Sequence, residues 1–195
     1  MPTIRELRIS YEEKEIADPR VGEPMTSTES VLGIMNFLRF SADEEVWAVL
    51  LDAQMKLIGT YQVAKGGRHE SMIDPASLFR TVLMAEAAAV ILVHNHPSGA
   101  VRPSPEDVRT TEKLVLAGFA LAVPLVDHVI IGSQDVYSFG RSGMLAWMQS
   151  GQLKALGFKH VPEVRNPEEA AREARENMAK LEKEAPCAAT AATAA

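Results

Sequence analysis

The sequence predicts an α/β sandwich with a central mixed β-sheet. Strand-like apolar runs alternate along the chain with segments whose apolar residues recur at helical spacing. The run at 45–51 is nearly all apolar, which indicates a strand covered on both faces. Cap and turn residues such as serine, proline and glycine separate the segments. Strands and helices in alternation are typical of layered α/β domains.

The first half of the domain contains two helices and a hairpin. In "TSTESVLGIMNFL", Thr26 or Ser27 is a candidate N-cap, and four apolar residues fall on one face of the helix that follows. Strands at 45–51 and 57–64 flank the turn "DAQMK". Pro75 begins the second helix at its first turn, where its missing N–H is tolerated.

The second half repeats this alternation. "AAVILVH" predicts a short buried strand, and the loop "NHPSGAVRP" connects it to a third helix. Ser104 is the expected N-cap of that helix, with Pro105 at its first position. "VPLVDHVIIG" and "VYSF" predict two further strands, and "SGMLAWMQ" a short closing helix.

Changes in composition divide the chain of 195 residues into four parts. A charged lead-in at 1–26 precedes one domain at 27–160. Residues 161–184 predict a polar helix, with Glu168 and Arg172 at the favourable i,i+4 spacing. The alanine- and threonine-rich segment 185–195 predicts disorder.

Charge and cysteine content limit the classes of partner and compartment. The net charge is -6 and no dense Lys/Arg run exists, which argues against a nucleic-acid partner for this chain. The single cysteine, Cys187, allows no disulfide within the chain. We find no signal peptide and no apolar run long enough to cross a bilayer. These observations predict a cytoplasmic protein without a membrane partner, and they leave its oligomeric state open.

The stretch "VILVHNHPSGAVRPSPED" offers three metal-ligating side chains. His94 and His96 point to one face of a strand end, roughly 6.5–7 Å apart, and can converge on one ion. Asp107, in the first turn of the following helix, can supply a third ligand. Three protein ligands that leave a fourth position for water are typical of a catalytic zinc site.

The same residues also fit a purely structural explanation. Ser104, Pro105 and the acids after them form a good helix start. A histidine on an apolar strand is usually a core or edge residue. Spacing alone gives the two interpretations equal weight.

The motif resembles that of a known family. His94-x-His96, seven residues, Ser104, two residues and Asp107 match the JAMM motif of the JAB/MPN metalloproteases. The segments "HNHPSG", "PSPED", "DHVIIG" and "YSF" are similar to those of the RadC family of bacterial JAB-domain proteins. The resemblance covers residues 27–147 and implies the JAB/MPN (cytidine-deaminase-like) α/β/α sandwich.

The resemblance also implies roles for individual residues. His94, His96 and Asp107 would hold zinc, and Ser104 would donate a hydrogen bond to the oxyanion. A glutamate before the first central strand would act as the general base, and the alignment selects Glu44 over Glu45. That choice matters because neighbouring side chains face opposite sides of a strand.

His128, in "DHVIIG", also matches the family pattern. The resemblance implies a residue that orients the ligands, since metal-bound histidines usually need such partners. A histidine of the strand core is the alternative interpretation.

The resemblance implies a zinc-dependent peptidase or isopeptidase with a protein or peptide substrate, typically a ubiquitin-like protein. The alternative is a non-catalytic JAB-fold binding module in a DNA-repair or phage/plasmid context. The presence of all five motif residues favours the hydrolase. Too few residues precede the first helix for the helix-hairpin-helix module that longer RadC relatives carry and that is associated with DNA binding. The resemblance therefore gives little support to a DNA-repair role for this chain. The zinc deaminases are excluded because no Cys-x-x-Cys signature exists, and the spacing does not fit an HNH nuclease.

Overall fold

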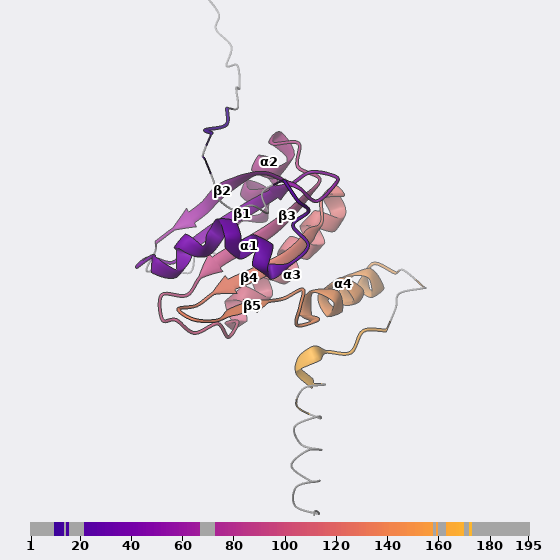
Figure 1. The fold of residues 1–195 in the computed structure, drawn as a ribbon. Coiled ribbons are helices and arrows are strands. Elements are labelled where there is room, and N and C mark those ends of the chain that lie inside the picture. The colour runs from indigo at the N-terminus through magenta and orange to yellow at the C-terminus, as the bar shows by residue number, and fades with distance from the viewer. Residues whose placement is uncertain are drawn as a thin grey trace, which may run out of the picture.

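A five-stranded mixed sheet forms the centre of the molecule (Figure 1). The computed structural model describes residues 10–13, 15, 22–66, 73–157, 159, 163–169 and 172. The strands are β1 (Glu45–Leu51), β2 (Leu57–Lys65), β3 (Ala89–Asn95), β4 (Leu125–Ile131) and β5 (Val136–Ser138). Their order is β2-β1-β3-β4-β5, and only the central pair β3 and β4 is parallel.

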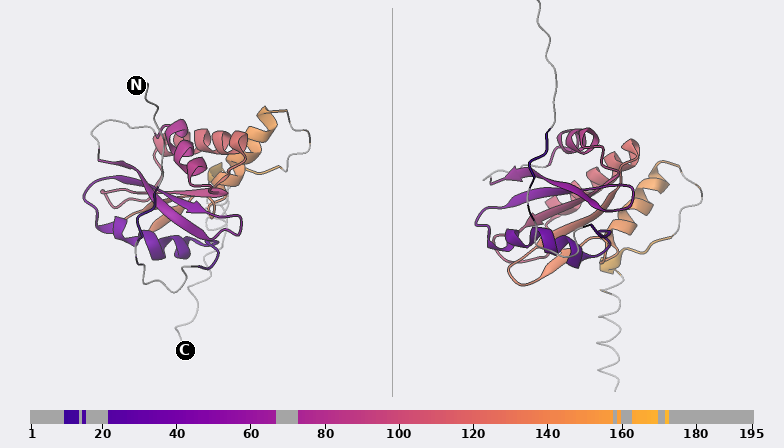
Figure 2. Two further views of the ribbon diagram at one scale, coloured as in Figure 1. Left: turned by 90° about the horizontal axis from the view of Figure 1, so that it is seen from above. Right: turned by 45° about the horizontal axis from the view of Figure 1, so that its top comes forward.

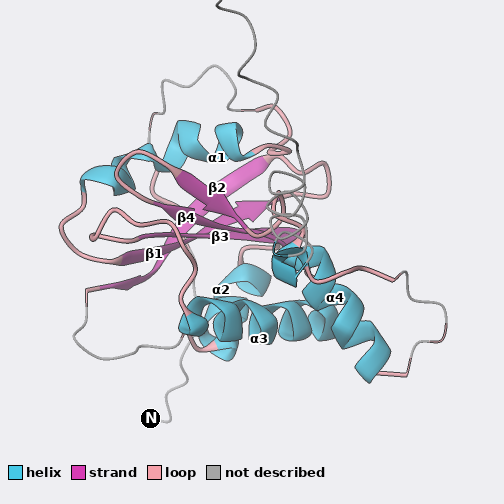
Figure 3. Ribbon diagram, turned by 90° about the horizontal axis from the view of Figure 1, so that it is seen from below, coloured by secondary structure: helices cyan, strands magenta, loops and turns pink. Residues whose placement is uncertain are grey.

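Helices cover both faces of this sheet. On one face lie α1 (Thr28–Met35) and the 3-10 helix η1 (Asn36–Phe40). The other face carries α2 (Pro75–Met84), α3 (Pro105–Leu121) and α4 (Met144–Ala155). Figures 2 and 3 show the sheet between these two helical layers. The predicted α/β sandwich with a mixed sheet is therefore confirmed.

The predicted strands and α-helices between residues 27 and 157 all occur, with differences of up to six residues at their ends. Ser27, rather than Thr26, caps α1, because its Oγ accepts the Ser30 N–H at 3.2 Å. The second strand continues one residue further, to Lys65, and the closing helix extends to Ala155. The sequence analysis missed η1, because a five-residue 3-10 segment is too short for a helical period to show.

Several of the sequence-based boundaries fall in parts of the chain that the structure does not describe. Segment 185–195 lies outside the described residues, as does most of 1–26 and of the predicted polar helix 161–184. Within that last segment, residues 167–169 are helical. None of the helices in the described ranges is both long and apolar enough to span a bilayer.

The two sheet faces carry separate apolar cores, and strand alternation assigns each residue to one of them. Along β3, Val90 and Leu92 pack against the layer of α2, α3 and α4. Ile91 and Val93 pack against the layer of α1 and η1. By the same alternation His94 lies on the α3 side of the sheet, and Asn95 lies on the α1 side.

Candidate metal centre

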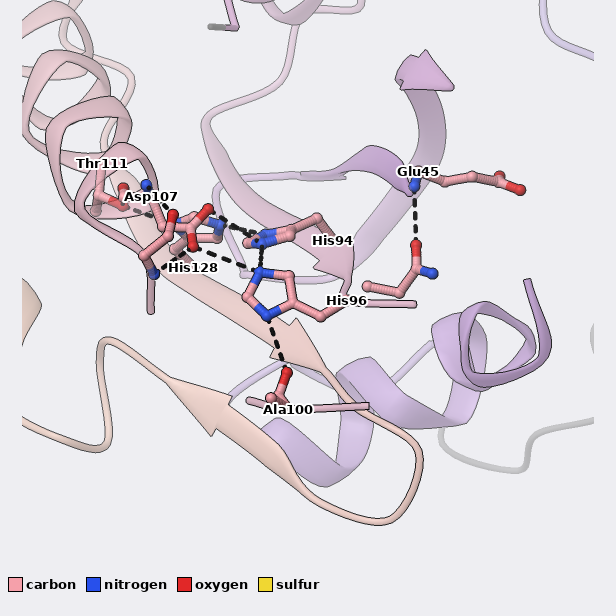
Figure 4. A network of polar contacts seen from close by, with 9 residues as sticks. Glu45, His94, His96, Ala100, Asp107, Thr111 and His128 are labelled. Carbon is pink, nitrogen blue, oxygen red and sulfur yellow. Dashed lines mark hydrogen bonds and ion pairs between the residues drawn. The ribbon is translucent and has the colours of Figure 1, made fainter. Parts of the chain in front are cut away.

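His94, His96 and Asp107 converge where β3 ends and α3 begins (Figure 4). Their nearest ligand atoms all lie within 4.8 Å of one another. The two Nε2 atoms are 2.9 Å apart, and Asp107 lies 3.2 Å from His94 Nε2 and 3.4 Å from His96 Nε2. Tetrahedral zinc with bonds of about 2.0–2.1 Å separates its ligand atoms by about 3.3 Å. The three side chains therefore have the spacing of a divalent metal site.

Local sequence explains how the strand, loop and helix present these ligands. His94 is the penultimate residue of β3 and only 2% exposed. The chain then turns through Gly99, whose φ of +81° favours glycine and whose N–H donates to His96 O at 2.9 Å. Ser104 begins α3, and this places Asp107 in the first helical turn.

A chain of hydrogen bonds sets the tautomer of His94. The Thr111 hydroxyl donates to the Asp107 carbonyl at 2.6 Å, so its oxygen accepts from the Nδ1–H of His128 at 2.7 Å. The Nε2 atom of His128 is then an acceptor, and it lies 2.8 Å from His94 Nδ1. His94 therefore carries its proton on Nδ1 and directs the lone pair of Nε2 toward Asp107 and His96.

A backbone carbonyl orients His96 in the same way. Its Nδ1–H donates to Ala100 O at 2.9 Å, which leaves the lone pair on Nε2. Two imidazole lone pairs thus face each other across 2.9 Å, beside a carboxylate. Such an arrangement is repulsive unless a cation or a proton lies between the nitrogens. The donor set of this structure therefore fits a bound divalent metal ion.

The pKa values of the candidate ligands reflect their mutual contacts. The hydrogen bond with Asp107 raises the pKa of His96 above 6.5, against the effect of its partial burial. Burial of Asp107 alone would raise its pKa, but His94 and His96 donate to the carboxylate when they are protonated, and this outweighs burial and holds the pKa of Asp107 well below its ordinary value. Complete burial holds the pKa of His128 well below 6.5, so this ring is neutral. An ionised Asp107 and neutral imidazoles are the forms that bind metal.

The structure separates the two glutamates before β1. The Glu45 carboxylate accepts hydrogen bonds from Ser41, Trp47 and Gln62 and pairs with Lys65 at 3.0 Å. It is only 6% exposed and points away from the histidines (Figure 4).

Glu44 lies on the other side of the strand. The antiparallel register pairs Val46 with His94, so continuing the register by two residues brings Glu44 opposite His96. Its charge contributes to the raised pKa of His96. Glu44 is exposed, and it immediately precedes β1.

Ser104 forms a capping box with Asp107. Its Oγ accepts the Asp107 N–H at 3.1 Å, while its own N–H donates to Asp107 Oδ2 at 2.7 Å. The structural interpretation of this segment and the metal-centre interpretation are thus both satisfied. The cap also orients the candidate ligand, because the Ser104 N–H holds Oδ2, the carboxylate oxygen that lies 3.4 Å from His96 Nε2.

Sequence reasoning missed three groups near the centre: the hydroxyl of Thr111 beside His128, the carbonyl of Ala100 beside His96, and the side chain of Asn95, which bonds to the backbone next to Glu44. Thr111 lies one helical turn after Asp107, and that spacing is a signal that was present in the sequence. No signal in the sequence indicates that the Ala100 carbonyl contacts His96.

Comparison with known proteins identifies the family. Residues 25–144 match the RadC-like JAB domain. The chain is 35% identical over 143 residues to a UPF0758 protein of Desulforudis audaxviator, covering 71% of this chain and 62% of the relative. For a UPF0758 protein of Thermotoga maritima the identity is 39% over 126 residues, 65% of this chain and 57% of the relative.

A third relative, a UPF0758 protein of Burkholderia cenocepacia, is 44% identical over 98 residues, 50% of this chain and 38% of the relative. The chain thus spans about two fifths to three fifths of the length of these three curated relatives. The matched domain includes the sheet and every candidate ligand of the metal centre. The chain belongs to the family of the RadC-like JAB domain.

Proposed function

We propose that the protein is a zinc-dependent peptidase or isopeptidase that hydrolyses a peptide or isopeptide bond with water. One observation carries this proposal: two imidazoles whose Nδ1 atoms hydrogen-bond away from the centre converge with a carboxylate at the end of β3. Glu44 immediately precedes β1, the strand that pairs with β3. Family membership supports the same chemistry.

His94, His96 and Asp107 would hold the zinc. Bound there, zinc would polarise the scissile carbonyl and lower the pKa of a water molecule toward ~7. His128 and Ala100 keep the two imidazoles in the tautomers that such binding needs.

Glu44 is the proposed general base. A base must be near the metal without being a ligand, and it must be free of strong structural partners. Glu45 fails this requirement because Ser41, Gln62 and Lys65 engage its carboxylate. Glu44 would accept the proton of the attacking water and pass it to the leaving amine.

Ser104 is the proposed donor to the oxyanion. Its oxygen accepts the Asp107 N–H, but accepting a hydrogen bond uses a lone pair and not the hydroxyl hydrogen. Ser104 can therefore cap α3 and still donate its hydrogen to the oxygen of the attacked carbonyl. A donor of this kind contributes about 2.7–4 kcal/mol of transition-state stabilisation.

The proposed substrate is a protein or a peptide, and family resemblance suggests a ubiquitin-like protein joined through its C-terminus. An extended substrate segment would present its scissile carbonyl at the exposed side of the centre, beside Glu44 and Ser104.

The test combines metal content with hydrolysis. Purified protein is expected to hold close to one zinc per chain, and His94→Ala or Asp107→Ala should lose it. Glu44→Gln should retain zinc and lose cleavage of peptides and of isopeptide-linked ubiquitin-like conjugates. Glu106→Gln is the matched control, because Glu106 pairs with Arg109 and lies outside the proposed set.

Two results would contradict the proposal in different ways. Hydrolysis that survives Glu44→Gln would show that another group is the base. Zinc binding without cleavage of any of these substrates would favour the non-catalytic binding module.

A further inference from the structure

We infer that Asn95, the residue between the two histidines, is a positioning residue that holds the Glu44 segment against the metal centre. Its importance for hydrolysis rests on the proposed function of Glu44. The positioning itself is a property of the fold and can be measured without any substrate.

The side chain of Asn95 hydrogen-bonds to the segment that carries Glu44. Its Oδ1 accepts the Glu45 N–H at 2.8 Å, and its Nδ2 donates to the Asp43 carbonyl at 3.0 Å. A longer contact of 3.5 Å joins Nδ2 to the Ser41 carbonyl. Asn95 thus engages the backbone on both sides of Glu44, and it is only 2% exposed.

These contacts occur where the strand ladder stops. The last β1–β3 pair in the register is Val46 with His94. Beyond this pair, toward the metal centre, the register contains no further residue pairs between the two segments. The amide of Asn95 takes the place of a backbone group opposite Glu45 and extends the pairing by side-chain bonds. On its other edge, the Glu44 carbonyl accepts the Gly66 N–H at 2.9 Å.

Strand alternation makes one tripeptide serve two purposes. His94 and His96 face the α3 side, where the ligands converge, while Asn95 faces the α1 side and reaches the neighbouring segment. The ligands and the proposed base are therefore positioned by the same three residues. This accounts for an asparagine that contributes no metal ligand.

Removing the amide should release the Glu44 segment and leave the ligands in place. In Asn95→Ala, the Glu45 N–H and the Asp43 carbonyl would turn to water, and Glu44 would sample positions away from the centre. Misplacement of a catalytic group by about 1 Å can reduce the rate by about 10²-fold. We expect kcat to fall by about 10–100-fold while the dissociation constant for zinc stays within about threefold.

Three measurements on the zinc- or cobalt-loaded full chain test this inference. Amide exchange at Glu45 should accelerate in Asn95→Ala, and the paramagnetic shift of the Glu44 amide in the cobalt(II) protein should change. In a double-mutant cycle on kcat, adding Asn95→Ala to Glu44→Gln should cause little further loss. Asn36→Ala is the matched control, because it removes a side-chain hydrogen bond with Arg39 that lies outside this segment.

An Asn95→Ala protein with unchanged Glu45 exchange and an unchanged Glu44 shift would overturn the inference, whatever its activity. So would a loss of zinc as severe as that of His94→Ala, since Asn95 would then act on the ligands. If Asn95→Ala does not fold, Asn95→Asp replaces it. The aspartate keeps an oxygen that accepts the Glu45 N–H, but its second oxygen repels the Asp43 carbonyl, to which the asparagine amide donates. A wild-type protein that hydrolyses nothing would contradict the proposed function alone, because the exchange and shift measurements still decide the role of Asn95.

Discussion

The Nδ1 atom of His94 lies 2.8 Å from the Nε2 atom of His128, and both rings are buried. His128 stacks on Phe139 with an interplanar angle of 7° and donates its Nδ1–H to Thr111. Because Phe139 and Thr111 fix the orientation of the His128 ring, its Nε2 atom is a fixed acceptor for His94. The metal centre therefore depends on a histidine that does not touch the metal position.

Replacing His128 with phenylalanine should weaken metal binding. His128→Phe keeps an aromatic ring against Phe139 but removes the acceptor for His94 Nδ1–H, so the tautomer of His94 is no longer set. We expect a 10–100-fold larger dissociation constant for zinc, measured by competition with a chelating dye. His128→Gln can offer an oxygen acceptor and should recover part of the affinity. Equal affinities of wild type and His128→Phe would contradict this role.

Zinc affinity should fall as the solution becomes more acidic. Metal binding needs a neutral imidazole, and the contact with Asp107 raises the pKa of His96 above 6.5. Protons therefore begin to compete at a higher pH than for an isolated histidine. Below that pKa, affinity should decrease about tenfold per pH unit for the one proton displaced. Titrations between about pH 5 and 8 would show this, and a flat profile would contradict it.

Ser104 variants should separate helix capping from catalysis. Ser104→Ala removes both the cap and the hydroxyl, and should cost about 1 kcal/mol of unfolding free energy. Ser104→Gly removes the hydroxyl as well, but a glycine cap costs only a few tenths of a kcal/mol. Both should lower kcat by about 10²–10³-fold, and Ser104→Thr should retain much of it. If hydrolysis follows stability across the three variants, Ser104 acts only as a cap.

Gly132 should be intolerant of a side chain. A Cβ at this position would lie 2.4 Å from the Gly99 carbonyl and 2.6 Å from Val101 Cγ1. Gly132→Ala would displace the loop that presents the Ala100 carbonyl to His96, so we expect a loss of about 1–3 kcal/mol in unfolding free energy. Zinc affinity should also fall in Gly132→Ala, because the Ala100 carbonyl would no longer orient His96.

The matched control is Gly151→Ala in α4. A Cβ there meets nothing within 4 Å, and alanine should stabilise the helix by up to about 1 kcal/mol. Urea denaturation of both variants measures the difference. A shift of the urea midpoint in the same direction for both substitutions would contradict this prediction.

Local patterns were sufficient to predict much of the fold and part of the centre. The N-caps, the apolar runs and the proline positions predicted the five strands and the four α-helices, but not the short η1, because these signals act within one turn or one strand. Strand alternation likewise placed His94 and His96 on one face, and the Ser104 cap placed Asp107 in a first helical turn. The meeting of the three side chains was a prediction from spacing and resemblance, and the structure brings them together.

Long-range packing decided the rest. The choice between Glu44 and Glu45 depends on how β1 pairs with β3, and no residue near either glutamate encodes that register. His128 reaches His94 only because β4 lies parallel to β3, and Thr111 joins them only because α3 crosses that face of the sheet.

The sequence by itself thus determined which residues end each strand, begin each helix and share a face, because those properties depend on neighbours along the chain. Only the tertiary structure decided which nitrogen of His94 carries the proton and what the side chain of Asn95 contacts. These depend on hydrogen bonds between residues 17 to 50 positions apart, which form only when the sheet and α3 pack together.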